Sequence, residues 1–231
     1  MKNRFLFVMF STISLLLPSI SNAAISFNKS EFQNNVAYAW NNNDDFLLKY
    51  ITDNNEDTFH FAEVAYNRGK PYRDYIVKKA REYNLPDEIF ALAGVESSYL
   101  INARSKSGAI GMWQFMTPTA REMGLINGRV DDRRDWKKST DAAMKYLAHL
   151  RDDHFYGDLE LSILAYNAGL GKVKRAIEKH QSVDVWYLIK DNKIFKQESI
   201  DYLPKFIAYF NLYQILDGAG DKKVVNTLAV N

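Results

Sequence analysis

Apolar residues recur every three or four positions after residue 70, which is the spacing of one face of an α-helix. The first such stripe, in residues 71–84, consists of Tyr72, Ile76, Ala80 and Tyr83. Pro71 suits the start of this helix because proline lacks the N–H group that a first-turn residue leaves unpaired. A second helix is expected from Pro86, and its residues are apolar on nearly every side. We therefore expect this second helix to form the buried centre of the domain.

Further helices are indicated by residues that favour helix ends. They are predicted over residues 117–124, after a cap at Ser139 or Thr140, over residues 158–169, and over residues 198–216. No segment alternates apolar and polar residues beside turn dipeptides, so a large β-sheet is not expected. The pattern predicts an all-α fold.

The first 23 residues carry the features of an export signal in the usual order. Lys2 and Arg4 precede an apolar run over residues 5–17, and Ser21-Asn22-Ala23 places small residues where a signal peptidase reads them. The apolar run is shorter than the ~20 residues that a helix needs to cross a bilayer. We expect cleavage after Ala23, with a retained membrane anchor as the alternative.

The remaining sequence divides into three segments. Residues 24–70 are rich in asparagine, with apolar residues at helical spacing between polar breaks. This composition predicts an N-terminal helical arm packed on the main domain. We expect the main domain over residues 71–217, followed by a C-terminal tail, residues 218–231, that is too short to fold as a module.

Charge and cysteine content exclude several classes of protein. Lys and Arg number 30 against 28 Asp and Glu, so the formal charge of +2 is too small for an electrostatic nucleic-acid binder. The absence of cysteine excludes disulfides, thiolate metal sites and a thiol nucleophile. The histidines lack metal-ligand spacing, although two of them share one predicted helix: His60, His149, His154 and His180. No metal or other cofactor is expected.

A candidate catalytic carboxylate stands at the end of the most apolar predicted helix. Glu96 holds this position, although a glutamate on a helix is usually a solvated surface residue. Residues 97–121 contain no Asp or Glu and include Gly108 and Gly111, which allow a tight turn or a close approach to a ligand. The large apolar residues of this segment are expected either along a groove or in the core: Trp113, Phe115 and Met116.

A second segment without carboxylates lies between Glu160 and Glu178. It contains Tyr166 and Asn167, whose phenol and amide groups suit hydrogen bonds with sugar hydroxyl and N-acetyl groups. The alternative is a structural role, in which Tyr166 is buried and the following residues end a helix.

Taken in order, these motifs resemble a known family. The matching blocks are Glu96-Ser97, Ser105, Gly108-Ala109-Ile110-Gly111-Met112-Trp113-Gln114-Phe115-Met116, Asp131-Asp132-Arg133-Arg134-Asp135, Thr140-Asp141-Ala142-Ala143, Tyr146-Leu147, Ala165-Tyr166-Asn167-Ala168-Gly169, and Glu198 with Tyr202, Pro204 and Lys205. They resemble the lytic murein transglycosylases of the goose-type lysozyme-like superfamily, most nearly the membrane-bound murein transglycosylase D type. The resemblance covers about residues 71–210 and implies a lysozyme-like transglycosylase catalytic domain over residues 71–217.

The implied activity is cleavage of the β-1,4 bond between N-acetylmuramic acid and N-acetylglucosamine in peptidoglycan, with formation of 1,6-anhydromuramoyl ends. Glu96 matches the family's catalytic acid, which protonates the leaving oxygen and then acts as the base. We expect burial to raise its pKa toward ~6, so that it carries a proton more often at neutral pH. Two alternatives stay open: a hydrolytic muramidase with a second carboxylate, and an inactive glycan-binding or secretion-accessory protein.

The resemblance also implies a set of substrate-binding residues: Ser105, Gln114, Met116, Tyr166, Asn167, Glu198 and Tyr202. Glu198 and Tyr202 match a late pair that closes the cleft, although Glu198 would also suit the first turn of a helix. The residues before Glu198 depart from the family pattern, since residues 195–197 replace the usual Leu-Pro. A separate group is expected to form an ion-pair and capping cluster: Asp131, Arg133 and Asp135.

The export signal implies a periplasmic or secreted protein. The expected partner is the glycan strand of peptidoglycan, without nucleic acid and without a stable membrane anchor after signal cleavage. Partners among secretion machinery or other cell-wall enzymes are left open.

Overall fold

Aspartates and glycines mark several helix ends in the described part of this protein. The structure, a computed structural model, describes residues 55–228, with side chains described over residues 58–218. Its α-helices are α3 (Asn55–Gly69), α4 (Arg73–Glu82), α5 (Phe90–Ser97), α6 (Thr117–Glu122), α7 (Trp136–His149), α8 (Leu159–Ala168), α9 (Leu170–His180), α10 (Val185–Leu188), α11 (Gln197–Ile200) and α12 (Tyr202–Leu228). The 3-10 helices η1 (Lys70–Tyr72) and η2 (Asp87–Ile89) precede α4 and α5, and the π-helical turn η3 (Leu150–His154) follows α7.

The sheet content of residues 55–228 is a single small hairpin. Strands β1 (Ile126–Asn127) and β2 (Val130–Asp131) pair antiparallel, with Ile126 opposite Asp131. The all-α prediction is confirmed by this architecture.

Helix α8 begins and ends where its sequence predicts. Asp158 precedes it and accepts a hydrogen bond from the backbone N–H of Leu161 at 2.9 Å. Gly169 follows it with a φ of +91°, a conformation that a residue with a Cβ rarely adopts. The cap at Asp158 and the helix end at Gly169 therefore place Asn167 and Ala168 in the last turn of α8.

The cap predicted for α7 is wrong. Asp135, not Ser139 or Thr140, accepts from the backbone N–H groups of the first turn. Ser139 and Thr140 are buried inside the helix. The reason is packing, since the ring of Trp136 lies edge-on against two tyrosines of η1 and α4 and so belongs to the first turn of α7.

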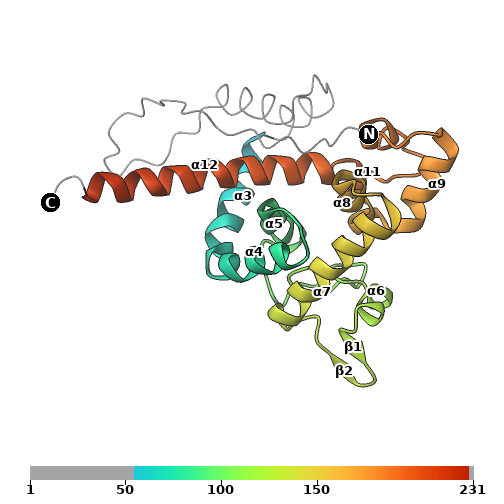
Figure 1. Ribbon diagram of the computed structural model, residues 1–231, viewed down its shortest axis with the longest axis horizontal. Helices are drawn as coiled ribbons and strands as arrows, with labels where there is room; N and C mark the ends of the chain where they lie inside the picture. Colours follow the sequence, from blue (N-terminus) through green and yellow to red (C-terminus); the bar gives the residue numbers. More distant parts are fainter. Residues whose placement is uncertain (1–54, 229–231) are drawn as a thin grey trace. The chain divides into compact units, whose positions relative to one another are not determined.

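Helix α5 forms the buried centre, as predicted. Its residues from Phe90 to Gly94 are buried, and α3, α4 and α12 pack against it (Figure 1). Gly94 allows the close approach of α12, because a Cβ there would overlap the phenol oxygen of Tyr213. The last turn of α5 is thereby held at one defined place beside α12.

The predicted last helix over residues 198–216 is divided in two. α11 ends at Ile200, Asp201 forms a turn, and α12 begins at Tyr202. α12 continues to Leu228, so its backbone runs through most of the expected C-terminal tail.

The expected signal peptide, residues 1–23, and the first part of the expected arm, residues 24–54, lie outside the described residues. The last part of the arm is α3, which packs on α5 and α12. Its buried apolar residues are Phe59, Ala62, Ala65 and Tyr66. Within the part of the protein that the structure describes, no helix combines the length and apolar character needed to cross a membrane.

Candidate active site

Glu96 lies in the last turn of α5, the most buried helix. The residue keeps some exposed surface, while its carboxyl group is enclosed by protein. Ser98 and Tyr99 then adopt φ angles of 51° and 60°, which end the helix. Tyr99 is buried, and its O–H donates to the backbone carbonyl of Phe90 at 2.8 Å. This turn fixes the end of α5 and with it the position of Glu96.

Tyr202 contacts Glu96 from the start of α12. Its O–H donates a hydrogen bond to Oε1 of Glu96. Burial, followed by the charge of Glu96, raises the pKa of Tyr202 well above its ordinary value, so the phenol remains a donor at neutral pH. The turn at Asp201 decides this contact, because it starts α12 at Tyr202.

The pKa of Glu96 is raised from 4.5 to about 7, chiefly by burial. The hydrogen bond from Tyr202 and the charge of Lys205 lower this pKa, whereas the charge of Glu198 raises it. Burial outweighs the two groups that stabilise the anion. The direction of the shift agrees with the sequence-based expectation.

Two charged residues act on Glu96 from distant parts of the sequence. Glu198 is exposed on α11, and Lys205 is half-buried on α12. Folding therefore supplies a second carboxylate near Glu96, although residues 97–121 contain none. Sequence reasoning gave Lys205 no role, and the signal that points to it is its place three residues after Tyr202 in the same motif.

Tyr166, in the last turns of α8, is also influenced by the charge of Glu96. Its O–H donates to the backbone carbonyl of Trp113 at 2.8 Å, and burial, followed by the charge of Glu96, raises its pKa well above the ordinary value. The neighbouring Asn167 has its side-chain oxygen Oδ1 buried without a hydrogen-bond partner. A buried acceptor without a donor is costly, so this oxygen is suited to receive one from a ligand.

The glycine-bearing segment between α5 and α6 forms a compact loop. Oγ of Ser105 accepts from the backbone N–H of Ala109 at 3.0 Å, and the Gln114 amide donates to the carbonyl of Gly111 at 2.7 Å. Gly111 has a φ of +86°, and a Cβ there would overlap the backbone carbonyl of Arg133. The close approach that Gly111 permits is thus to the protein's own backbone, not to a ligand.

The large apolar residues of this loop separate into core and surface. Trp113 and Phe115 are buried, and the Trp113 indole N–H donates to Oγ1 of Thr140 at 2.9 Å. Met116 is 43% exposed. Oγ of Ser97 donates to the carbonyl of Met112 at 2.7 Å, which joins the loop to the end of α5. The core interpretation holds for Trp113 and Phe115, while Met116 remains available at the surface.

Arg133 organises the predicted ion-pair and capping cluster. It is 5% exposed as a residue, and its guanidinium makes two hydrogen bonds to the carboxylate of Asp131, at 2.9 and 2.7 Å. It also donates to the carbonyl of Phe115 at 3.1 Å. Asp135, two residues further along the sequence, caps α7. The structural role expected for this cluster is confirmed.

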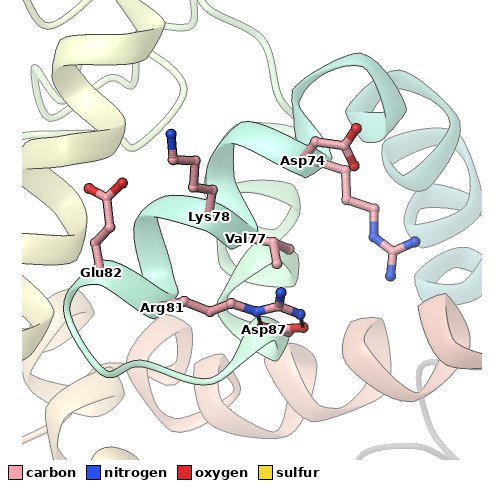
Figure 2. A pocket seen from close by; sticks show the side chains of 7 residues that line it. Asp74, Val77, Lys78, Arg81, Glu82 and Asp87 are labelled. Atoms are coloured by element: carbon pink, nitrogen blue, oxygen red, sulfur yellow. Dashed lines mark hydrogen bonds and ion pairs between the residues drawn. The ribbon is translucent and has the colours of Figure 1, made fainter.

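Metal-binding clusters and surface depressions were the other candidate sites among the described residues. Among the described residues, no three His, Asp or Glu side chains are grouped so as to hold a metal ion. A shallow depression over α4 and η2 (Figure 2) is lined by Arg73, Asp74, Val77, Lys78, Arg81, Glu82 and Asp87. Arg81 pairs with Asp87 there, and none of the predicted site residues lines it.

Comparison with known proteins finds lytic murein transglycosylases among the relatives of this chain. Membrane-bound lytic murein transglycosylase D of Escherichia coli (strain K12) is 36% identical over 146 residues, which are 61% of this chain and 31% of that protein. Membrane-bound lytic murein transglycosylase F of Desulfosudis oleivorans is 30% identical over 190 residues, 68% of this chain and 40% of that protein. The chain thus spans about a third of the length of the first of these relatives.

A solved structure shows the same fold. The 70 kDa soluble lytic transglycosylase of Escherichia coli is 24% identical, with a TM-score of 0.56 over 84% of this chain and 32% of that one. The lysozyme-like fold expected from the sequence is confirmed. The family model described as Transglycosylase SLT domain matches residues 74–189, half of the chain. With the matched segment containing Glu96, Gln114 and Tyr166, the chain belongs to the transglycosylase SLT domain family.

Proposed function

We propose that this protein cleaves the β-1,4 bond between N-acetylmuramic acid and N-acetylglucosamine in peptidoglycan and leaves 1,6-anhydromuramoyl ends. The observation that carries the proposal is the enclosed carboxyl group of Glu96, with its pKa raised to about 7 and a hydrogen bond from Tyr202. Family membership supports the substrate class, because both relatives described above are named lytic murein transglycosylases.

Glu96 supplies both proton transfers. Its carboxyl O–H passes a proton to the glycosidic oxygen as the bond from that oxygen to C1 breaks. The carboxylate then removes the proton of the C6 hydroxyl while that oxygen bonds to C1, which closes the anhydro ring and returns Glu96 to its protonated form. No water is consumed. General acid–base help of this kind contributes on the order of 10² to 10⁴ in rate.

The raised pKa suits a group that must act first as acid and then as base. A carboxyl group at its reference pKa of ~4.3 is protonated in about one molecule in 500 at pH 7. With the pKa raised to about 7, Glu96 is protonated in roughly half of the molecules at that pH. Neither form is then scarce, which is the condition that general acid–base catalysis favours.

The substrate contacts of the proposal are Ser105, Gln114, Met116, Tyr166, Asn167, Glu198 and Tyr202. The partnerless oxygen of Asn167 supports a bond from a sugar N–H or O–H group. The exposure of Met116 and Glu198 supports contact with an apolar and a polar part of the sugar, respectively. Tyr202 holds the carboxyl group of Glu96 toward the bond that breaks.

A hydrolytic muramidase is the second candidate, and one observation favours it. The charge of Glu198 acts on Glu96, and a hydrolytic mechanism needs a second carboxylate to activate a water molecule. The two candidates differ in product mass, because anhydro ends lack one water relative to hydrolysed ends.

Export to the periplasm or the exterior belongs to the same proposal. Peptidoglycan lies outside the inner membrane, and residues 1–23 have the features of a cleaved signal. N-terminal sequencing of the protein recovered from the periplasm tests this, with Ala24 expected as the first residue.

The decisive experiment incubates purified protein with intact sacculi and analyses the released muropeptides by mass spectrometry. We expect anhydro products from the native protein and a loss of at least about 10²-fold in rate for Glu96→Gln. Glu178→Gln is the matched control, because Glu178 is an exposed glutamate on α9 and is not among the proposed contacts. Near-normal turnover by the Glu96 variant would discard the assignment, and hydrated ends would replace it with the muramidase.

A further inference from the structure

Lys205 is a half-buried cation that the chemistry above leaves without a role. It lies on α12, three residues after Tyr202, so the two side chains are neighbours one turn apart on the helix surface. Its ammonium lies 5.4 Å from the centre of the Tyr209 ring, one turn further along α12. Among the described residues it forms no direct ion pair.

A half-buried lysine without a direct counter-ion is costly to keep charged. Burial lowers the pKa of Lys205, and the charges of Glu96 and Glu198 raise it again. The two carboxylates therefore favour the charged ammonium. The interaction is reciprocal, because the ammonium of Lys205 in turn favours the ionised form of Glu96.

Four groups from three helices act on the carboxyl group of Glu96, Tyr202 by a direct hydrogen bond and the others through their charge or polarity. They are Tyr202 and Lys205 on α12, Glu198 on α11 and Tyr166 on α8. Tyr202 is a neutral donor, and Glu198 carries a like charge. Lys205 is thus the cation in this set, and its removal leaves the anion of Glu96 with a hydrogen bond but with no opposite charge.

We propose that Lys205 is a positioning residue that stabilises the carboxylate of Glu96 after its proton has passed to the leaving oxygen. The proposal rests on the proposed function and adds a group that favours the second half of that reaction. Burial alone would favour the acid and make the carboxylate more costly to form. The ammonium offsets part of that cost, so one side chain serves as acid and then as base.

A titration that needs no substrate tests this. The carboxyl carbon of Glu96 is followed by ¹³C NMR against pH in glutamate-labelled protein, with the signal assigned by its loss in Glu96→Gln. Lys205→Met is expected to raise the pKa of Glu96 by about 0.5 to 1 unit, and Lys205→Arg to leave it near the native value. Glu198→Gln is expected to move it downward, because a like charge is removed.

The opposite signs of these shifts separate electrostatics from a general disturbance of packing. Circular dichroism establishes that each variant is folded. The proposal is overturned if the pKa of Glu96 in Lys205→Met lies within about 0.2 unit of its value in the native protein. A difference that small is less than the shift expected from the loss of a nearby opposite charge. The proposal is likewise overturned if Lys205→Arg shifts the pKa as much as Lys205→Met does.

Activity on sacculi supplies the second readout. In Lys205→Met we expect kcat to fall about 10-fold with little change in KM. The alkaline limb of the kcat/KM profile is expected to move to higher pH, together with the pKa of Glu96. A shift in the NMR titration without any glycan cleavage by the native protein would leave the Lys205–Glu96 coupling intact and reject the proposed function. An unchanged titration in an active enzyme would reject the role of Lys205 alone.

Discussion

The phenol of Tyr202 donates a hydrogen bond to the carboxyl group of Glu96, and the two residues are 106 positions apart in the sequence. The bond joins the last turn of α5 to the first turn of α12, whose packing is shown in Figure 1. It stabilises the ionised form of Glu96, since it lowers a pKa that burial raises. The protonation of Glu96 is therefore set by contacts between distant segments, not by its own helix.

Removal of this hydrogen bond has a predicted kinetic signature. Tyr202→Phe keeps the buried ring and loses only the hydroxyl, so the pKa of Glu96 is expected to rise above about 7. A hydrogen bond to a charged group contributes about 1.5 to 3 kcal/mol, and we expect kcat to fall at least about 10-fold. The pH profile of muropeptide release measures both effects.

The control for this variant is Tyr187→Phe, since Tyr187 is 52% exposed on α10. We expect its activity to equal that of the native protein. A Tyr202→Phe enzyme with native kcat and a native alkaline limb would contradict the positioning role of the phenol.

Glu96 is also predicted to reduce stability at neutral and alkaline pH. Its folded-state pKa of about 7 lies above the unfolded value of ~4.3, so the folded state binds more protons between these values. The free energy of unfolding therefore falls as pH rises from about 4 to 7, by about 2 to 3 kcal/mol from this group.

Glu96→Gln lacks this titration, so its stability advantage should be small at pH 4.5 and largest at pH 8. Urea unfolding of both proteins at the two pH values measures the difference. An advantage that is equal at both pH values would show that Glu96 does not titrate in this range.

Gly111 is predicted to be the glycine of the loop that tolerates substitution least. A Cβ at this position would overlap the backbone carbonyl of Arg133, in addition to the strain of a φ of +86°. We expect Gly111→Ala to lower the free energy of unfolding by about 3 kcal/mol or more.

Gly124→Ala is the matched control, because Gly124 has a φ of +80° and no atom within 4 Å of the added Cβ. Its expected cost is about 1 kcal/mol, from the backbone conformation alone. Equal losses in the two variants would mean that the approach of Arg133 contributes nothing.

Local sequence predicted those elements whose ends are set by nearby residues. Asp158 and Gly169 bound α8 as expected, and the uniformly apolar residues after Pro86 form the buried centre. The cap of α7 was missed because Trp136 extends the helix by packing on α4, and such a contact is not visible in the spacing of residues 135–140. The break between α11 and α12 was also missed, although Pro204 in the first turn of α12 is a local signal for it, since a proline cannot donate the backbone hydrogen bond that a continuous helix over residues 198–216 needs there.

By itself the sequence determined the helical class and the family, and it predicts Glu96 as the catalytic residue, because apolar periodicity and ordered motifs are properties of the residue order alone. Only the tertiary structure decided which groups surround that carboxyl group. Tyr166, Glu198, Tyr202 and Lys205 reach it from three helices. A pKa depends on burial and on the distances to charges and donors, and these are fixed when α8, α11 and α12 pack near the end of α5.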